Sequence, residues 1–171
     1  MSKNTLKKEL ELLSAEQLRQ IILDAYNVNS DFKQYFEFFL NPDIDKFRNN
    51  KIELIKKELS RSKWGVSKAR TSVINKIVKE FIAYNVGAEH TIHFINIVLQ
   101  YVCLYENLAK YKDSHFNYIA RLTKTMIEYA NANQCADMCM ESLSKNILQH
   151  DQIRRHTKGI VQEAIDDALN R

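Results

Sequence analysis

A cluster of basic side chains between residues 56 and 79 is the part of the sequence best suited to binding chemistry. It holds eight Lys and Arg residues and one acid, whereas residues 1–55 hold eight bases and nine acids, and residues 80–171 hold nine and eleven. The whole chain has a net charge of +4, so this cluster carries all of the positive excess. Concentrated cations neutralise phosphates, and an exposed indole stacks on a base. The candidate site for an anionic partner therefore consists of Lys56, Lys57, Arg61, Lys63, Trp64, Lys68 and Arg70.

The same residues also have a purely structural interpretation. Lys56 and Lys57 would end a helix, where the helix dipole favours cations. Trp64, the only Trp of the chain, would anchor a loop on the helices, and Lys76 and Lys79 would lie on a solvated helix face. The exposure of Trp64 and its basic neighbours therefore separates a binding surface from a loop that is merely basic.

Two pairs of possible metal ligands lack the pattern of a metal site. His90 and His93 are three residues apart in "EHTIH", which differs from the zinc-protease motif HExxH with its four-residue His spacing. Cys135 and Cys139 would share one helical face, and the apolar residues that continue this face indicate core thiols. Two ligands without a third or fourth make a weak zinc site. We therefore expect no metal and no cofactor.

Catalytic motifs are not recognisable in the sequence. Gly65, Gly87 and Gly159 are its only glycines, so neither a Gly-x-Ser-x-Gly nucleophile elbow nor a Gly-rich phosphate loop can form. The stretch "HDQIRRH" at residues 150–156 could form a small polar pocket, or it could supply the caps and charges of a helix junction. We therefore predict that the protein is not an enzyme, leaving open a site that folding alone assembles.

The elements that must position these residues are predicted to be helices. Three Gly and one Pro in 171 residues disfavour sheets, while 45% apolar and 27% charged residues are typical of a globular chain. The sequence marks helix ends with a capping box at Ser14–Gln17, a start at Asn41–Pro42 and a left-handed stop at Gly87. The uncharged run Thr91–Tyr105 predicts a helix buried on several faces. The fold class is therefore all-α, with about eight helices.

The expected organisation is a single domain over residues 1–171. Within it we expect N-terminal helices over 1–60, a basic connector over 61–70 and helical hairpins over 71–171. The hairpins are read as antiparallel helix pairs spanning about 67–111 and 113–150, lengths in the range of HEAT repeats. Because the two pairs share no convincing residue pattern, an irregular bundle and a HEAT-like α-α superhelix remain equally open.

Three stretches of the sequence resemble a known family. They are "LKKELELLSAEQL" near the start, the Asn41–Pro42 helix start and "GVSKARTSVINKIVKEF", residues 65–81, which begins within the basic segment. Together they are similar to a family of small bacterial all-helical proteins known only as a domain of unknown function, and the resemblance covers roughly the first half of the chain. It implies an all-helical fold and a bacterial cytoplasm, and it provides no catalytic residues to carry over.

These observations favour a function based on contact with another macromolecule. We expect a non-catalytic helical interaction module with a protein partner, and the alternative is a nucleic-acid-binding protein that uses residues 56–79. A homodimer joined through the uncharged helix Thr91–Tyr105 is a third possibility. Neither a signal peptide nor a membrane-spanning run is visible, and three Cys suit a reducing compartment. We therefore expect a cytoplasmic protein.

Overall fold

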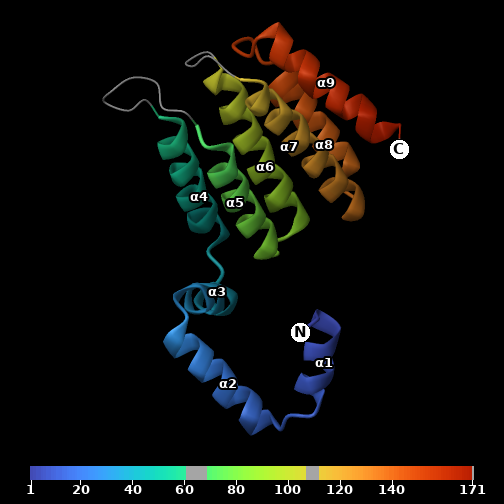
Figure 1. The fold of residues 1–171 in the computed structure, drawn as a ribbon. Helices are drawn as coiled ribbons and strands as arrows, with labels where there is room; N and C mark the ends of the chain where they lie inside the picture. Colours follow the sequence, from blue (N-terminus) through green and yellow to red (C-terminus); the bar gives the residue numbers. More distant parts are fainter. Residues whose placement is uncertain (61–68, 107–111, 171) are drawn as a thin grey trace. The chain divides into compact units, whose positions relative to one another are not determined.

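The computed structural model of the chain describes residues 1–60, 69–106 and 112–170. Of these residues 82% are helical, and they form nine α-helices, one short π-helical segment and no strand. The predicted all-α fold class is confirmed. The helices belong to two compact units, Met1–Asp43 and Ile44–Arg171, which we call unit 1 and unit 2 (Figure 1).

Unit 1 consists of three helices that begin at capping side chains. They are α1 (Lys3–Glu11), α2 (Ala15–Val28) and α3 (Ser30–Leu40). The predicted capping box is present, because Ser14 Oγ accepts from the Gln17 backbone N–H while Gln17 Oε1 accepts from the Ser14 N–H. Side-chain oxygens of Ser2 and Asn29 cap α1 and α3. Local hydrogen bonds therefore set where each helix of unit 1 begins.

α2 and α3 pack against each other through aromatic side chains. The Phe36 ring lies 5.7 Å from the ring of Phe32, 6.3 Å from that of Phe39 and, edge-on, 6.4 Å from that of Tyr26. The Tyr26 hydroxyl donates a 2.8 Å hydrogen bond to Glu37 Oε1, which raises the pKa of Tyr26. No residue of α1, α2 or α3 is buried. Taken by itself, unit 1 is a set of helices without a core.

Unit 2 contains the hydrophobic core. Its elements are α4 (Ile44–Leu59), α5 (Thr71–Ala83), α6 (Ala88–Tyr105), α7 (Asp113–Ala132), α8 (Ala136–Leu143), the π-helical segment η1 (Ser144–Leu148) and α9 (Arg155–Leu169). The rings of Phe47, Phe81 and Phe94 stack in series across α4, α5 and α6, with centroid distances of 5.1 and 3.9 Å. Phe81 and Phe94 are fully buried, so this stack joins three helices of the core.

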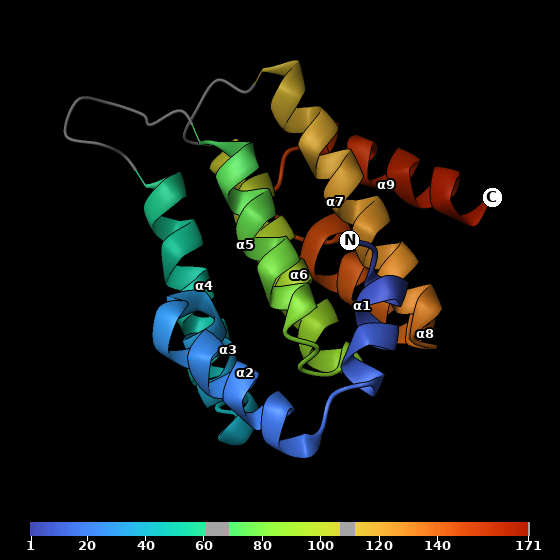
Figure 2. The same ribbon diagram turned by 60° about the horizontal axis from the view of Figure 1, so that its bottom comes forward.

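α6 is the central helix of unit 2, as the uncharged run predicts. It contacts α4, α5, α7 and α8, and Figures 1 and 2 show it beside α5 and α7. Ten of its residues are buried: Thr91, Ile92, Phe94, Ile95, Asn96, Val98, Leu99, Val102, Cys103 and Tyr105. Most of its apolar surface is thus taken up within unit 2, and the dimer contact through Thr91–Tyr105 stays a prediction.

The packing of unit 2 combines contacts between successive helices with contacts between helices two apart in the chain. α7 packs most extensively against α9, with α8 between them in the sequence, and α4 packs on both α5 and α6. A HEAT-like superhelix stacks helix pairs on one another, so contacts between helices two apart in the chain fit it as well as they fit an irregular bundle. The expected pairs, α5 with α6 and α7 with α8, are present in order but do not make the strongest contacts.

The boundaries of the units differ from the expected segments. The expected N-terminal segment 1–60 includes α4, but Ile52, Ile55 and Leu59 on this helix are buried in the core of unit 2. The unit boundary therefore precedes α4, since burial of its apolar face joins α4 to α5 and α6. That residues 1–171 form one domain stays a prediction.

Two helix ends also differ from the sequence expectation. Asn41 ends α3, and α4 begins only at Ile44, two residues after Pro42. The left-handed residue after α5 is Asn85, with φ of 51°, whereas Gly87 has φ of 102° and precedes α6. The Gly87 carbonyl accepts hydrogen bonds from the N–H and Oγ1 of Thr91, so Gly87 serves the start of α6 rather than the end of α5.

Candidate functional site

The predicted basic site lies partly in the described structure. Lys56 and Lys57 lie in the last turn of α4, as expected, and Arg70 precedes the first residue of α5. The other four predicted residues lie outside the described residues: Arg61, Lys63, Trp64 and Lys68. The geometry of the site therefore depends on the ends of α4 and α5.

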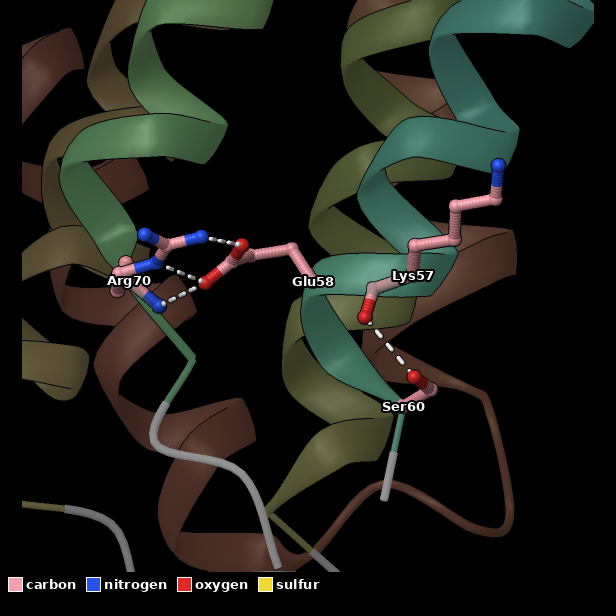
Figure 3. A network of polar contacts seen from close by, with 4 residues as sticks. All are labelled: Lys57, Glu58, Ser60 and Arg70. Atoms are coloured by element: carbon pink, nitrogen blue, oxygen red, sulfur yellow. Dashed lines mark hydrogen bonds and ion pairs between the residues drawn. The ribbon is translucent and has the colours of Figure 1, made fainter. Parts of the chain in front are cut away.

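Arg70 is bound to a carboxylate of α4. Its Nε and Nη2 donate to Oε1 and Oε2 of Glu58 at 2.9 and 2.8 Å, and its backbone N–H donates to Oε1 at 2.8 Å (Figure 3). These hydrogen bonds lower the pKa of Glu58, whose side chain is only 11% exposed. A bidentate pair of this kind fixes geometry as well as charge. The pair joins the entry of α5 to the end of α4, and an anion would have to compete with Glu58 for Arg70.

The two lysines at the end of α4 have different surroundings. Lys56 Nζ forms a 2.8 Å ion pair with Glu53 and lies 5.6 Å from the ring centroid of Tyr101. The hydrogen bond to Glu53, followed by the charge interaction with Tyr101, raises the pKa of Lys56. Lys57 is exposed, and its side chain points away from the Glu58–Arg70 pair (Figure 3). Among the three described cations of the predicted site, two are thus committed to acids.

The other candidate residues of the sequence lie in structural settings. His90 and His93 are exposed, and burial of the His93 ring, then Arg48, then His90, lower the pKa of His93. Cys139 is buried, which raises its pKa to about 11, whereas Cys135 is half-buried and donates to the Asn133 carbonyl at 3.3 Å. Core burial is therefore confirmed for Cys139 but not for Cys135.

The stretch "HDQIRRH" is divided between two roles. His150 Nδ1 accepts from the Gln152 N–H at 3.2 Å, which is a cap of the junction before α9. Arg154 lies 3.6 Å from the buried carboxylate of Glu106, which also accepts a hydrogen bond from Thr157 Oγ1. These contacts fasten the start of α9 to the end of α6. His156 instead faces α7, where it borders a hollow that the sequence did not indicate.

This hollow lies between α7 and α9 and has a volume of about 350 Å³. At one end the rings of Phe116 and His156 meet edge to face, 4.9 Å apart, and at the other Lys124 Nζ forms a 2.8 Å ion pair with Asp167. The second contact lies further along the chain than the first on both helices, so α7 and α9 run in the same general direction. We call this hollow the α7–α9 groove, and its lining is Asp113, Phe116, Asn117, Ala120, Lys124, His156, Ile160, Glu163, Ala164 and Asp167.

The α7–α9 groove has an apolar floor and a polar rim. Ala164 is buried, while Phe116, Ala120 and Ile160 are half-buried. Two rim carboxylates, those of Asp113 on α7 and Glu163 on α9, are exposed and have no ion-pair partner among the described residues. Such a groove can hold an apolar stem on its floor and a polar head at its rim.

Sequence reasoning missed the groove for a definable reason. Each half of its lining follows helical spacing, at positions 113, 116, 117, 120 and 124 and at 156, 160, 163, 164 and 167. This spacing shows which residues share a face of each helix. It does not show that these two faces meet, because α8 separates α7 from α9 in the chain.

A second hollow, of about 200 Å³, lies between α4 and α6. It is lined by Lys56, Leu59, Tyr101, Leu104 and Tyr105. Its walls are largely apolar, and its one cation, Lys56, is paired with Glu53. This hollow can accept a small apolar group and offers no further charged partner.

The chain belongs to a family of unknown function, DUF6155, whose family model matches residues 1–164. This confirms the resemblance to an uncharacterised domain family and extends it from the first half of the chain to nearly all of it. No curated protein and no solved structure matches the chain. None of the helices that the structure describes combines the length and the apolar character needed to cross a bilayer.

Proposed function

We propose that this member of the family is a non-catalytic helical module that binds a partner protein in the α7–α9 groove. The observation that carries the proposal is the combination of a hollow of about 350 Å³ with an apolar floor and exposed rim carboxylates. Ligand sites commonly have volumes from about 300 Å³ upward and pair apolar walls with a few polar groups. Grooves between two helices are also a recurrent seat for a peptide or a helix of a partner.

The composition of the groove supports binding rather than catalysis. Its lining includes no Ser, Thr or Cys, the side chains that an adjacent base activates as nucleophiles. Lys124 and Asp167, two of its charged groups, bind each other at 2.8 Å. Function is best argued from a site, and this site offers surface and charge rather than an activated group.

Nucleic-acid binding through residues 56–79 is the second candidate function. It is favoured by Lys57, Lys76 and Lys79, which are exposed and have no ion-pair partner among the described residues. We rank it second because Glu53 and Glu58 already bind Lys56 and Arg70. Titration with duplex DNA and with RNA at low salt tests it, since phosphate contacts are strongest there. Binding that is lost when Lys57, Lys76 and Lys79 are changed to Glu would reverse this ranking.

The proposed function is tested by affinity capture with a variant that fills the groove. Ala120→Trp places an indole on the half-buried floor, and Ala132→Trp places one at the exposed end of the same helix as a matched control. We expect a partner protein that the wild type and Ala132→Trp recover from the cell of origin and that Ala120→Trp does not. Circular dichroism checks that both variants keep their helices. Recovery of the same proteins by all three chains would refute binding in the groove.

A further inference from the structure

We infer that the segment bound in the α7–α9 groove is basic, and that it presents Lys or Arg side chains to the rim carboxylates. This inference rests on the proposed function and adds the chemistry of the partner. The groove is lined by three carboxylates, those of Asp113, Glu163 and Asp167, and by one lysine, Lys124. Because Lys124 is taken by Asp167 at 2.8 Å, two carboxylates remain to be matched by a ligand.

The two remaining carboxylates lie on different helices and at different levels of the groove. The contact between Phe116 and His156 marks one level. Asp113 lies three residues before Phe116 on α7, and Glu163 lies seven residues after His156 on α9, which is about 10 Å further along the helix. One side chain cannot serve both carboxylates at this separation. The occupant therefore offers two cations along an extended or helical segment rather than a single charged group.

The floor between the carboxylates suits the stems of such side chains. Phe116, Ala120 and Ile160 are half-buried and contribute apolar surface to the lining. Lys and Arg lay their aliphatic stems on apolar surface while the charged head reaches a polar partner. An aromatic ring such as Phe116 also attracts a cation placed over its face. Floor and rim thus select the same kind of side chain.

Glu163 is the stronger of the two anchors. Asp166, one turn further along α9, is exposed outside the groove lining and adds a negative charge near Glu163. Asp113 is instead flanked by Lys112, an exposed cation that opposes a basic ligand. The loss of Glu163 should therefore weaken binding more than the loss of Asp113.

The charge of the whole molecule makes the inference testable with simple probes. The chain has a net charge of +4, so a polycation is repelled overall and binds only where the local charge is negative. Three fluorescein-labelled peptides of about twelve residues serve as probes, alternating alanine with arginine, glutamine or glutamate. A peptide of this length makes about three turns if it is helical, and it is longer still if it is extended, so it can reach both rim carboxylates. Their binding to the full chain is followed by fluorescence anisotropy at ~0.02 and ~0.15 M ionic strength.

We expect the arginine peptide to bind most tightly, and its affinity to fall at the higher ionic strength. Glu163→Gln should weaken its binding about tenfold, and Asp113→Asn should weaken it less. Glu128→Gln is the matched control, because Glu128 is exposed on α7 outside the groove and its removal changes the net charge equally. Ala120→Trp should abolish binding of the arginine peptide.

Each contrary result has a distinct meaning. If the glutamine or glutamate peptide bound more tightly than the arginine peptide, and Ala120→Trp abolished that binding, the inference of a basic partner would be wrong. The proposed function would still stand. Equal weakening of peptide binding by Glu128→Gln and Glu163→Gln would overturn the inference. The affinity would then depend on the net charge of the chain and not on the rim carboxylates. Absence of arginine-peptide binding at low ionic strength would overturn it as well. The capture experiment with Ala120→Trp decides the proposed function independently of all three peptides.

Discussion

Unit 1 and unit 2 are both built from amphipathic helices, yet they bury very different amounts of apolar surface. Eleven of the thirteen exposed large hydrophobic side chains among the described residues lie in unit 1. No residue of α1, α2 or α3 is buried, whereas α6 alone buries ten. An amphipathic pattern thus specifies a helix and its apolar face, but a core forms only where several such faces meet around one another.

The two units also differ in how their helices begin. Each helix of unit 1 has a side-chain cap, at Ser2, Ser14 and Asn29, whereas α5, α6, α8 and α9 in unit 2 have no side-chain cap hydrogen bond. A cap stabilises a helix end by about 1 kcal/mol, while burying one large apolar side chain contributes about 1.5–3 kcal/mol. Packing therefore replaces capping in unit 2, and unit 1 depends on local interactions.

Hydrogen exchange should show the largest difference between the units. Amides in the middle of α6 are expected to exchange only through global unfolding, and amides of α1 through local opening. The difference in exchange rate should be roughly 10³-fold or more, given the usual free energy of global unfolding. Exchange measured residue by residue by NMR checks this. Equal protection in α1 and α6 would show that unit 1 gains its stability from more than its own helices.

Truncation of one phenylalanine in each unit should separate them by stability. Phe94→Ala removes a fully buried ring stacked 3.9 Å from Phe81, so it should lower the free energy of unfolding by about 3–5 kcal/mol. Phe36→Ala removes a half-buried ring of unit 1 and should cost less than about 1 kcal/mol in the same transition. Urea denaturation followed by circular dichroism measures both. Similar losses would contradict the absence of a core in unit 1.

Removal of a helix cap should lower the local stability of unit 1, whereas a Ser→Ala change on a helix of unit 2 should not alter its stability. Ser14→Ala removes the Oγ that accepts from the Gln17 N–H, while the backbone N–H of residue 14 can still donate to Gln17 Oε1, and it should lower the local stability of α2 by about 1 kcal/mol. Ser72→Ala in α5 is the control, because Ser72 is exposed and does not cap that helix. Exchange rates of the amides in α2 and α5 report the two effects. Unchanged exchange in α2 would show that the cap does not stabilise it.

The smallest expected effect concerns the ion pair at the entry of α5. Hydrogen bonds from Arg70 lower the pKa of Glu58, so the folded carboxylate stays ionised where the unfolded one takes up a proton. The stability from this pair is fully present above the ordinary pKa of 4.5 and is lost as the pH falls through the lower value of the folded state.

Glu58→Gln should therefore flatten the loss of stability of unit 2 below pH 4.5. The effect should be modest, because the Arg70 side chain is largely exposed and solvent screens the pair. Thermal unfolding over a pH series measures it, with Glu128→Gln as the control. If the wild type and Glu58→Gln lost stability in parallel, the pair would not contribute to the pH dependence.

Local features of the structure could be predicted from particular residues. The capping box at Ser14–Gln17 and the burial of α6 both rest on side chains within a few turns of each other. The helix start predicted at Pro42 lies two residues before the observed start of α4. The left-handed conformation predicted for Gly87 at the end of α5 is adopted by Asn85. Signals within one turn therefore indicate that a helix begins or ends, and the exact residue depends on competing neighbours.

The candidate sites were predictable only where charge could be counted along the chain. The basic cluster was visible, and the spacing of Glu53 and Lys56 on one helix allows their pair, but the pairing of Arg70 with Glu58 was not visible because twelve residues separate them. A count of charges assigns no partners. The structure assigned Glu58 to Arg70 by bringing the end of α4 to the start of α5.

The sequence by itself determined that this chain is helical and which face of each helix is apolar, because capping and side-chain spacing act within one or two turns. Only the tertiary structure decided which faces meet. The ion pair between Lys124 and Asp167 joins residues 43 positions apart, and the groove beside it exists because α7 packs on α9 instead of chiefly on α8. That choice depends on how whole helix surfaces fit together, and such a fit is a property of shapes in space rather than of spacing along the chain.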